Sequence, residues 1–319
     1  MAASLLSATA KLNDLLLSRQ VHSTIFPYAW LPTLHALRIA FIHTNLKAKV
    51  QQAQKANQKS GSSPPPAPTT FAYDLAGFLI MAWGGGFLVN FILGQTPMQL
   101  LSIHPFLNYA GVYVVISTLS QFVNLPAMKM LDTAFIFLDG SLRSHAVIMS
   151  VLTTKASINP AVQNSLFIQI LCGTIGATGG GQLAGMLSVI SPQGWSFSTP
   201  PFLRATTLVE VIDIIAASVC ATVFGITTLS HPAYSPVLAR VYNDNGKALF
   251  TPTGARAACT IIFALAFAYR ATVLHWLPAP SAARPIAKAK IASSEGVSKS
   301  AIDSPKRSSS PAKRLRNKA

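Results

Sequence analysis

Charged side chains are scarce in this sequence of 319 residues, and acidic ones are the scarcest. Asp, Glu, Lys and Arg together make up 11% of the chain, and nine residues are acidic. A soluble domain usually has about a quarter of its residues charged. Because half of the residues are hydrophobic, the chain has too little polar surface to cover a globule in water. The composition predicts an integral membrane protein.

Cysteine is also rare, and sequence motifs for metal binding or catalysis are lacking. Cys172, Cys220 and Cys259 all fall in apolar stretches, where single cysteines act as small packing residues. No two histidines have the spacing of metal ligands, and we find neither a phosphate-binding loop nor a Ser/His/Asp arrangement of catalytic type. We therefore expect no metal, no protein-bound cofactor and no enzymatic activity.

The formal net charge of +16 is concentrated outside the apolar runs. Residues 278–319 carry ten basic and two acidic side chains, so half of the net charge lies in a tail rich in Ser, Pro and Ala. Such a composition predicts disorder. A basic segment beside a membrane span is typical of the cytosolic side. We expect a cytosolic tail that does not bind nucleic acid.

Apolar runs of about the length that crosses a bilayer predict seven transmembrane helices. They cover residues 24–45, 71–93, 104–126, 131–153, 165–190, 203–229 and 255–277. Residues 1–23 predict a short interfacial segment on the non-cytosolic side, 47–70 a basic cytosolic linker ending in prolines, and 230–254 a loop. Seven spans place both basic segments on one face, as the positive-inside rule requires. Polar residues interrupt the first and fourth runs.

The sequence resembles itself at a spacing of 96 residues. Gly84-Gly85 aligns with Gly180-Gly181, and Pro105-Phe106-Leu107 aligns with Pro201-Phe202-Leu203. Each copy holds three spans, residues 24–126 and 127–229. Because an odd number of spans reverses the starting side, the copies are predicted to be inverted, as in many transporters and some channels. The seventh span lies outside the repeat.

Each copy contains three consecutive glycines within a span. These are Gly84, Gly85 and Gly86, and Gly179, Gly180 and Gly181. Glycine destabilises a helix interior by about 1 kcal/mol per residue. The triplets therefore predict a broken or kinked helix, or a very close approach of another helix. One interpretation is tight packing, which small residues favour in membranes. The other is a pair of helix breaks whose carbonyl groups line an ion path.

The segments around these glycines resemble the trimeric intracellular cation channel family over roughly residues 24–277. The residues that carry the resemblance are Trp83–Leu88, Gly94–Pro97, Leu100–His104, Gly176–Gly181, Trp195 and Pro201. The resemblance implies seven spans in two inverted repeats. It also implies a homotrimer of the endoplasmic or sarcoplasmic reticulum with one potassium-conducting pore in each protomer, which balances charge while calcium leaves the store.

In that family a basic motif on the fourth span engages a phosphoinositide head group. The matching stretch here runs from Asp139 to Arg143. Arg143 fits the arginine of the motif, whereas Asp139 reverses the charge of its lysine. Arg143, Asp139 and Lys129 are the candidate residues for lipid binding or gating that the resemblance implies.

Charged residues within apolar runs are costly and usually face protein or water. Asp139 and Arg143 are four residues apart and predict a pair on one helix face. Glu210 and Asp213 predict either a cation-attracting pore mouth or carboxylates neutralised by Arg204 or by another helix. Arg270, near the end of the last span, is expected to reach the membrane interface.

The sequence therefore favours a monovalent cation channel for potassium in an intracellular membrane such as the endoplasmic reticulum. Two other classes stay open. A secondary transporter would use the same inverted repeats around a closed pocket. A non-conducting membrane scaffold would use the glycines for packing alone, with its basic tail holding partners or lipid.

Overall fold

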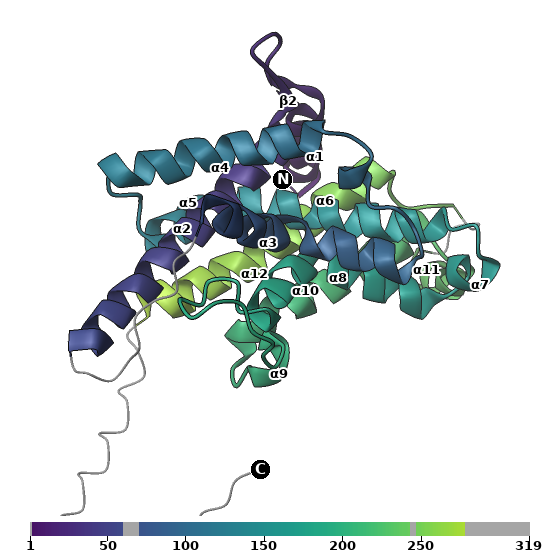
Figure 1. Ribbon diagram of the computed structural model, residues 1–319. Coiled ribbons are helices and arrows are strands. Elements are labelled where there is room, and N and C mark those ends of the chain that lie inside the picture. Colours follow the sequence, from purple (N-terminus) through teal and green to yellow (C-terminus); the bar gives the residue numbers. More distant parts are fainter. Residues whose placement is uncertain (1, 60–69, 243–246, 278–319) are drawn as a thin grey trace, which may run out of the picture. The chain divides into compact units, whose positions relative to one another are not determined.

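Long helices form where the sequence has its apolar runs (Figure 1). The computed structural model describes residues 2–59, 70–242 and 247–277. The helices at the seven runs are α2 (Trp30–Lys59), α3 (Phe71–Ile92), α4 (His104–Phe122), α6 (Ile136–Lys155), α8 (Leu166–Met186), α10 (Leu208–Thr228) and α12 (Pro252–Ala271). The predicted tail 278–319 and residues 60–69 of the predicted linker lie outside the described residues.

Shorter elements connect these helices. The helical ones are α1 (Ala2–Ser18), η1 (Met98–Leu100), α5 (Met128–Ala134), α7 (Pro160–Gln163), α9 (Pro201–Arg204), η2 (Pro232–Tyr234), α11 (Ser235–Tyr242) and the π-helical turn η3 (Thr272–Trp276). Strands β1 (Gln20–His22) and β2 (Phe26–Ala29) form an antiparallel hairpin ahead of α2. The first predicted span, which began at residue 24, therefore starts as a strand and becomes helical at Trp30.

Within the described residues, four helices are long and apolar enough to cross a membrane. They are α3, α8, α10 and the helix Pro252–Trp276, and α5 with α6 makes a fifth if the pair counts as one span across its 69° bend. This confirms the prediction of a helical protein integrated into a membrane. Polar residues interrupt the first and fourth predicted runs. The first run gives α2, which is not among the helices that could cross a membrane, and the fourth gives the bent pair of α5 and α6.

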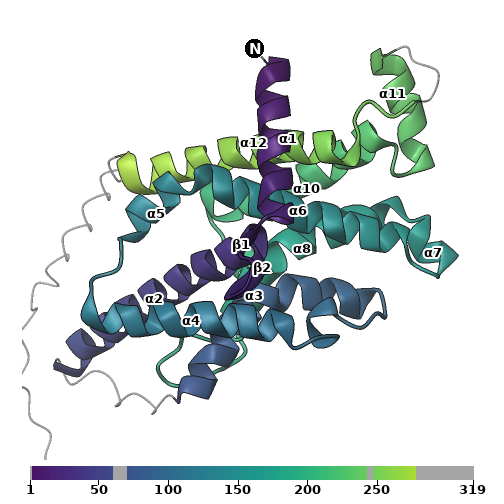
Figure 2. The same ribbon diagram turned by 90° about the horizontal axis from the view of Figure 1, so that it is seen from above.

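The described helices pack around two hydrophobic cores. Aromatic residues dominate the first, in which Phe78 and Trp83 of α3 pack between α2 and the Tyr109 and Tyr113 side chains of α4. The second core is built mainly from α6, α8, α10 and α12, with Phe263 at 0% exposure. In Figure 2, α4 and α12 lie on opposite sides, with α3 and α8 between them. The first core draws on helices within residues 24–126, and the second combines helices within residues 127–229 with α12, which lies outside the predicted repeat.

Helix α1 is anchored to the second core through polar groups. The buried Asn13 amide donates a hydrogen bond to Thr260 of α12 at 3.1 Å and accepts one from Ser141 of α6 at 2.8 Å. Asp14 and Arg256 form an ion pair at 3.4 Å. The N-terminal helix predicted from the sequence is present, and it docks against helices of the bundle.

Helix α2 extends further than the predicted span. The segment from residue 47, expected to be a linker, stays helical up to Lys59. Its Lys, Gln and Ala residues are all good helix formers, and the first prolines come only at Pro64. Helix α2 therefore continues beyond the point at which hydrophobicity is lost.

The three cysteines are buried thiols, as the sequence predicts. Cys220 of α10 and Cys259 of α12 face each other, and each thiol donates to the other's backbone carbonyl, at 3.6 and 3.4 Å. Cys172 lies fully buried on α8. Their small side chains let the helices of the second core approach closely.

Candidate functional site

The two glycine triplets meet where α3 crosses α8. A Cβ atom built on Gly84 would lie 3.2 Å from the Cα atom of Gly180. On Gly85 it would lie 2.6 Å from the carbonyl oxygen of Gly176, and on Gly180 it would lie 2.3 Å from that of Met81. Real Cβ atoms essentially never approach other atoms so closely. The helices touch backbone to backbone, which only glycine permits.

Both helices run without interruption through the glycines. Helix α3 continues to Ile92 and α8 continues to Met186. The helix breaks expected at Gly84–Gly86 and Gly179–Gly181 are therefore absent from these two described helices. Packing explains Gly84, Gly85, Gly179 and Gly180, because the close contact between α3 and α8 offsets the weak helix propensity, whereas Gly86 and Gly181 lie outside that contact.

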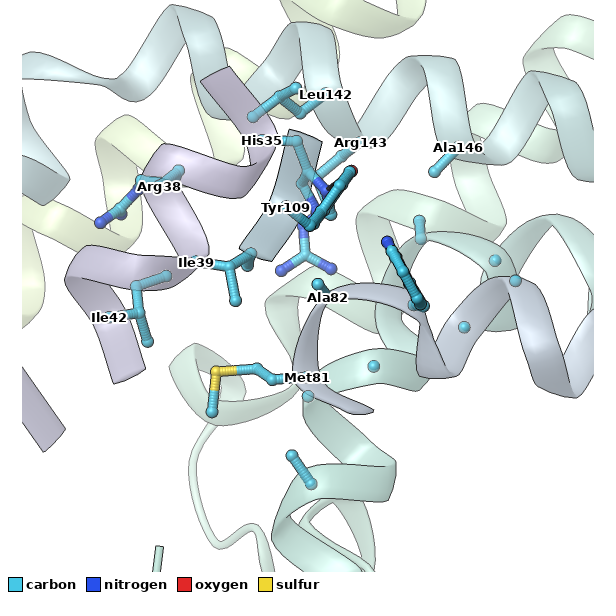
Figure 3. Close-up of a pocket in the computed structure, with 18 of the residues that line it drawn as sticks. His35, Arg38, Ile39, Ile42, Met81, Ala82, Tyr109, Leu142, Arg143 and Ala146 are labelled. Carbon is cyan, nitrogen blue, oxygen red and sulfur yellow. Dashed lines mark hydrogen bonds between the residues drawn. The ribbon is translucent and has the colours of Figure 1, made fainter. Parts of the chain in front are cut away.

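A cavity of about 1130 Å³ lies beside this crossing. Its walls come from α2, α3, α6, α8 and α12, and they include Gly85 and Gly86 of one triplet and Gly180 and Gly181 of the other. Figure 3 shows the side chains of His35, Tyr109 and Arg143 gathered near its centre. The remaining lining mixes apolar side chains with hydroxyl and amide groups. Four of the six glycines predicted to line a path thus lie at the cavity wall, and Gly84 and Gly179 do not.

One wall of the cavity carries a buried cluster of charges centred on Arg38. This residue is 4% exposed, and its guanidinium donates to Asp132 at 2.6 Å and to Asp139 at 2.8–3.1 Å. His275 of η3 contacts the other oxygen of Asp132 at 2.9 Å. Two carboxylates around one arginine neutralise a charge that is costly in a bilayer. The cluster ties α2 to α5, α6 and η3.

This cluster corrects the predicted pairing of Asp139 with Arg143. Asp139 contacts Arg38 of another helix, and the nearest carboxylate to Arg143 is Asp213 at 3.9 Å. A planar guanidinium from a facing helix binds a carboxylate through two parallel hydrogen bonds, which the exposed face of a single helix rarely offers. Arg143 instead reaches into the cavity.

Asp213 is neutralised by other helices, which is one of the two predicted alternatives. Arg270 of α12 donates to it at 2.7 Å. The guanidinium of Arg270 bonds a carboxylate of α10 and lines the cavity, and its expected place at the membrane interface stays a prediction. With Arg270 beside it and Arg143 further away, Asp213 is not a free carboxylate that attracts cations.

Glu210 also has a structural role. Its carboxylate accepts hydrogen bonds from the backbone amides of Thr206 at 2.6 Å and Thr207 at 3.3 Å, and Thr207 completes a capping box at the start of α10. Glu210 is thus committed to helix capping. Glu210 and Asp213, predicted to act together, therefore make separate contacts, one with the start of α10 and the other with Arg270.

Lys129 lies apart from Arg143 and Asp139. Its ammonium group sits 3.7 Å from the centre of the Trp276 ring, a cation–π contact between α5 and η3. Arg38, His35 and Asp132 are cavity residues for which sequence reasoning assigned no role. His35 and Arg38 are among the polar residues that interrupt the first apolar run, and an arginine within such a run is itself a signal of a functional site.

The cavity offers hydrogen-bonding groups and compensated charges inside an otherwise apolar bundle. Its arginines are Arg38, Arg143 and Arg270, and the carboxylates that face them are Asp132, Asp139 and Asp213. Such a lining can hold water and polar solutes. Comparisons of this chain with protein-family models, with curated proteins and with solved structures each found no match.

Proposed function

We propose that this protein is a potassium-conducting monovalent cation channel of an intracellular membrane, such as the endoplasmic reticulum. In this proposal it is a homotrimer with a pore inside each protomer. The observation that carries the proposal is the cavity of about 1130 Å³ beside the glycine crossing. A cavity with charged and hydrogen-bonding groups among apolar helices gives ions a route that the bilayer itself denies them.

The lining of the cavity favours water inside it. The buried Nη1 atom of Arg38 has no hydrogen-bond partner among the described residues, and Arg38 lines the cavity. A buried N–H group without a partner destabilises the fold by about 1–3 kcal/mol, and ordered water commonly satisfies such groups. A hydrated cavity is the first requirement of an ion path.

The arrangement of the helices agrees with two related halves around this cavity. Gly84 and Gly180 occupy equivalent positions in the 96-residue repeat, and their backbones meet at the crossing. Equivalent residues meet where a two-fold axis passes through a contact. The helices of each half also contribute to a different hydrophobic core, the second of which α12 completes. These observations support the proposal of two inverted three-helix repeats followed by a seventh span.

The charges around the cavity bear on which ions pass. Asp132 and Asp139 both line it, and both contact Arg38. Arg143, whose side chain is 31% exposed and 3.9 Å from Asp213, is the least neutralised of the three arginines. In the channel that we propose, Arg143 opposes cations and limits their flow. The resemblance also implies a phosphoinositide head group, for which Arg143 is the better placed cation because Lys129 contacts Trp276.

Single-channel recording of the purified protein in planar bilayers tests the proposal. A variant that fills the cavity sharpens the test. A Cβ atom on Gly181 meets no other atom within 4 Å, so Gly181→Leu adds a side chain at the cavity wall without a backbone clash. Gly111→Leu is the control, because Gly111 lies on α4, its Cβ atom would have a single neighbour at 3.9 Å, and it does not line the cavity.

We expect potassium-selective unitary currents that Gly181→Leu reduces and Gly111→Leu leaves unchanged. Currents of equal size in both variants would place the ion path elsewhere. Absence of unitary currents together with coupled uptake of a solute would favour the secondary transporter. Absence of both activities would favour the non-conducting scaffold.

A further inference from the structure

A second cavity lies where α2 continues beyond its apolar part, and it shares Val50 and the turn Val189–Pro192 with the first cavity. It has a volume of about 310 Å³. One wall is the later half of α2, another is the first turn of α3 with Tyr73 and Asp74, and the third is the turn Val189–Pro192 after α8. Volumes of about 300 Å³ and above are typical of small-ligand sites.

The α2 wall is mostly polar, with Val50 as an apolar member. Its polar members are His43, Lys47, Gln51, Gln54, Lys55 and Gln58. They recur at spacings of three, four and seven residues, so they share one helix face. His43 and Gln54 are buried on this face, where apolar residues would pack better. These two buried polar side chains point to a polar occupant.

Two buried polar groups on this wall lack partners in the described part of the chain. Gln54 is 7% exposed and its amide nitrogen Nε2 makes no hydrogen bond there. His43 is 2% exposed and its Nδ1 atom is likewise unsatisfied. Buried polar atoms are nearly always hydrogen-bonded in native structures. Both residues line the cavity, so a ligand there would supply what the protein does not.

The charge around the cavity is positive. Lys47 and Lys55 contribute two ammonium groups, and Asp74 contributes one carboxylate that pairs with Lys47. Lys55 is exposed. The amide nitrogen of Gln54 and both ammonium groups are hydrogen-bond donors. A surplus of donors and of positive charge selects an anion.

We propose that this second cavity binds a phosphate group, carried by a lipid head group or by a small soluble phosphate compound. Lys55 and Lys47 supply the charge, as lysines do in other phosphate sites, and Gln54 supplies a neutral donor. Phosphate fits better than a single carboxylate because its several oxygens can engage donors spread over three turns of α2. The site is independent of what the protein conducts.

Replacing Asp74 tests the proposal, because the proposal predicts whether binding becomes tighter or weaker. In the structure Asp74 holds Lys47, so it competes with an incoming anion and repels it. Replacing Asp74 with asparagine frees Lys47 and removes the repulsion. An anion site becomes tighter in this variant, whereas a site for a cation or an amine becomes weaker.

The experiment uses the full-length protein in a neutral maltoside detergent and isothermal titration calorimetry. The probes are inorganic phosphate, glycerol 3-phosphate and phosphatidic acid dispersed in the same detergent. We expect Lys55→Gln and Gln54→Leu to weaken binding about tenfold and Asp74→Asn to tighten it severalfold. The matched control is Lys49→Gln, because Lys49 is an exposed lysine on α2 that does not line the cavity.

Binding of glycerol 3-phosphate or inorganic phosphate identifies a soluble ligand, and binding of phosphatidic acid alone identifies a lipid. Either result supports the site if Lys55→Gln weakens binding and Lys49→Gln does not. Failure of all three probes overturns the proposal. Equal effects of Lys55→Gln and Lys49→Gln also overturn it, since they would locate binding elsewhere. Because Lys55 is exposed, its variant decides the matter even if Asp74→Asn fails to fold.

Discussion

The contact between α3 and α8 predicts opposite effects for alanine at two neighbouring positions of one glycine triplet. At Gly180 a Cβ atom would lie 2.3 Å from the carbonyl oxygen of Met81, which is about 1 Å short of an ordinary contact. At Gly181 the same atom would meet nothing within 4 Å. Gly180→Ala must therefore push the two helices apart, and Gly181→Ala need not move anything.

The size of the difference follows from two terms. Alanine favours the helix over glycine by up to about 1 kcal/mol, and both variants gain this equally. Overpacking costs about 1–3 kcal/mol, because a gap of 0.5–1 Å already forfeits a quarter to a half of the dispersion energy of the atoms it separates. Only Gly180→Ala has this cost. We expect it to be less stable than Gly181→Ala by about 1–3 kcal/mol.

Reversible unfolding in mixed detergent micelles measures this difference, and thermal melting in one detergent supports it. The comparison uses two variants of identical chemistry on one helix, so helix propensity and hydrophobicity cancel. If Gly180→Ala proves as stable as Gly181→Ala, α3 and α8 are not in backbone contact at Gly180, and the packing account of the triplets fails.

Three further predictions concern the charged residues. Arg38→Gln leaves Asp132 and Asp139 without their cation and should destabilise the protein by about 3–5 kcal/mol in the same unfolding assay, whereas Arg19→Gln at an exposed site should change little. Arg143→Gln should raise the potassium conductance and Arg143→Lys should preserve it; a lower conductance in Arg143→Gln would refute its opposing role. Glu210→Gln should leave the conductance unchanged and slightly lower the melting temperature, because Glu210 caps α10.

The positions of the helices could be predicted from the sequence, because bilayer length and hydrophobicity set them locally. The glycine triplets could also be recognised from the sequence, since three consecutive glycines need a steric reason. The sequence alone could not decide between helix breakage and close packing. The outcome depends on the crossing of α3 with α8, whose glycines are about a hundred residues apart in the chain. The helices pack closely and do not break, because each glycine triplet faces glycines of the other helix.

The ion pairs were the least predictable part of the site. Arg38 finds Asp132 and Asp139 on other helices, 94 and 101 residues away, whereas sequence spacing indicates partners only within one helix. The role of Glu210 is different, because Thr207 followed three residues later by Glu210 is a readable capping signal. Its charge alone does not reveal this role. The extent of α2 likewise does not follow from hydrophobicity, because Lys, Gln and Ala residues favour a helix beyond the apolar run.

The backbone contact at the crossing also limits how the protein can recover from mutation. A side chain that is too large is often accommodated by a smaller one opposite. At Gly180 and Gly85 the opposing atoms are carbonyl oxygens of Met81, Ile175 and Gly176, and a carbonyl cannot be made smaller. A suppressor screen on Gly180→Ala should therefore return substitutions that shift a whole helix, and none that shortens a neighbouring side chain at the crossing.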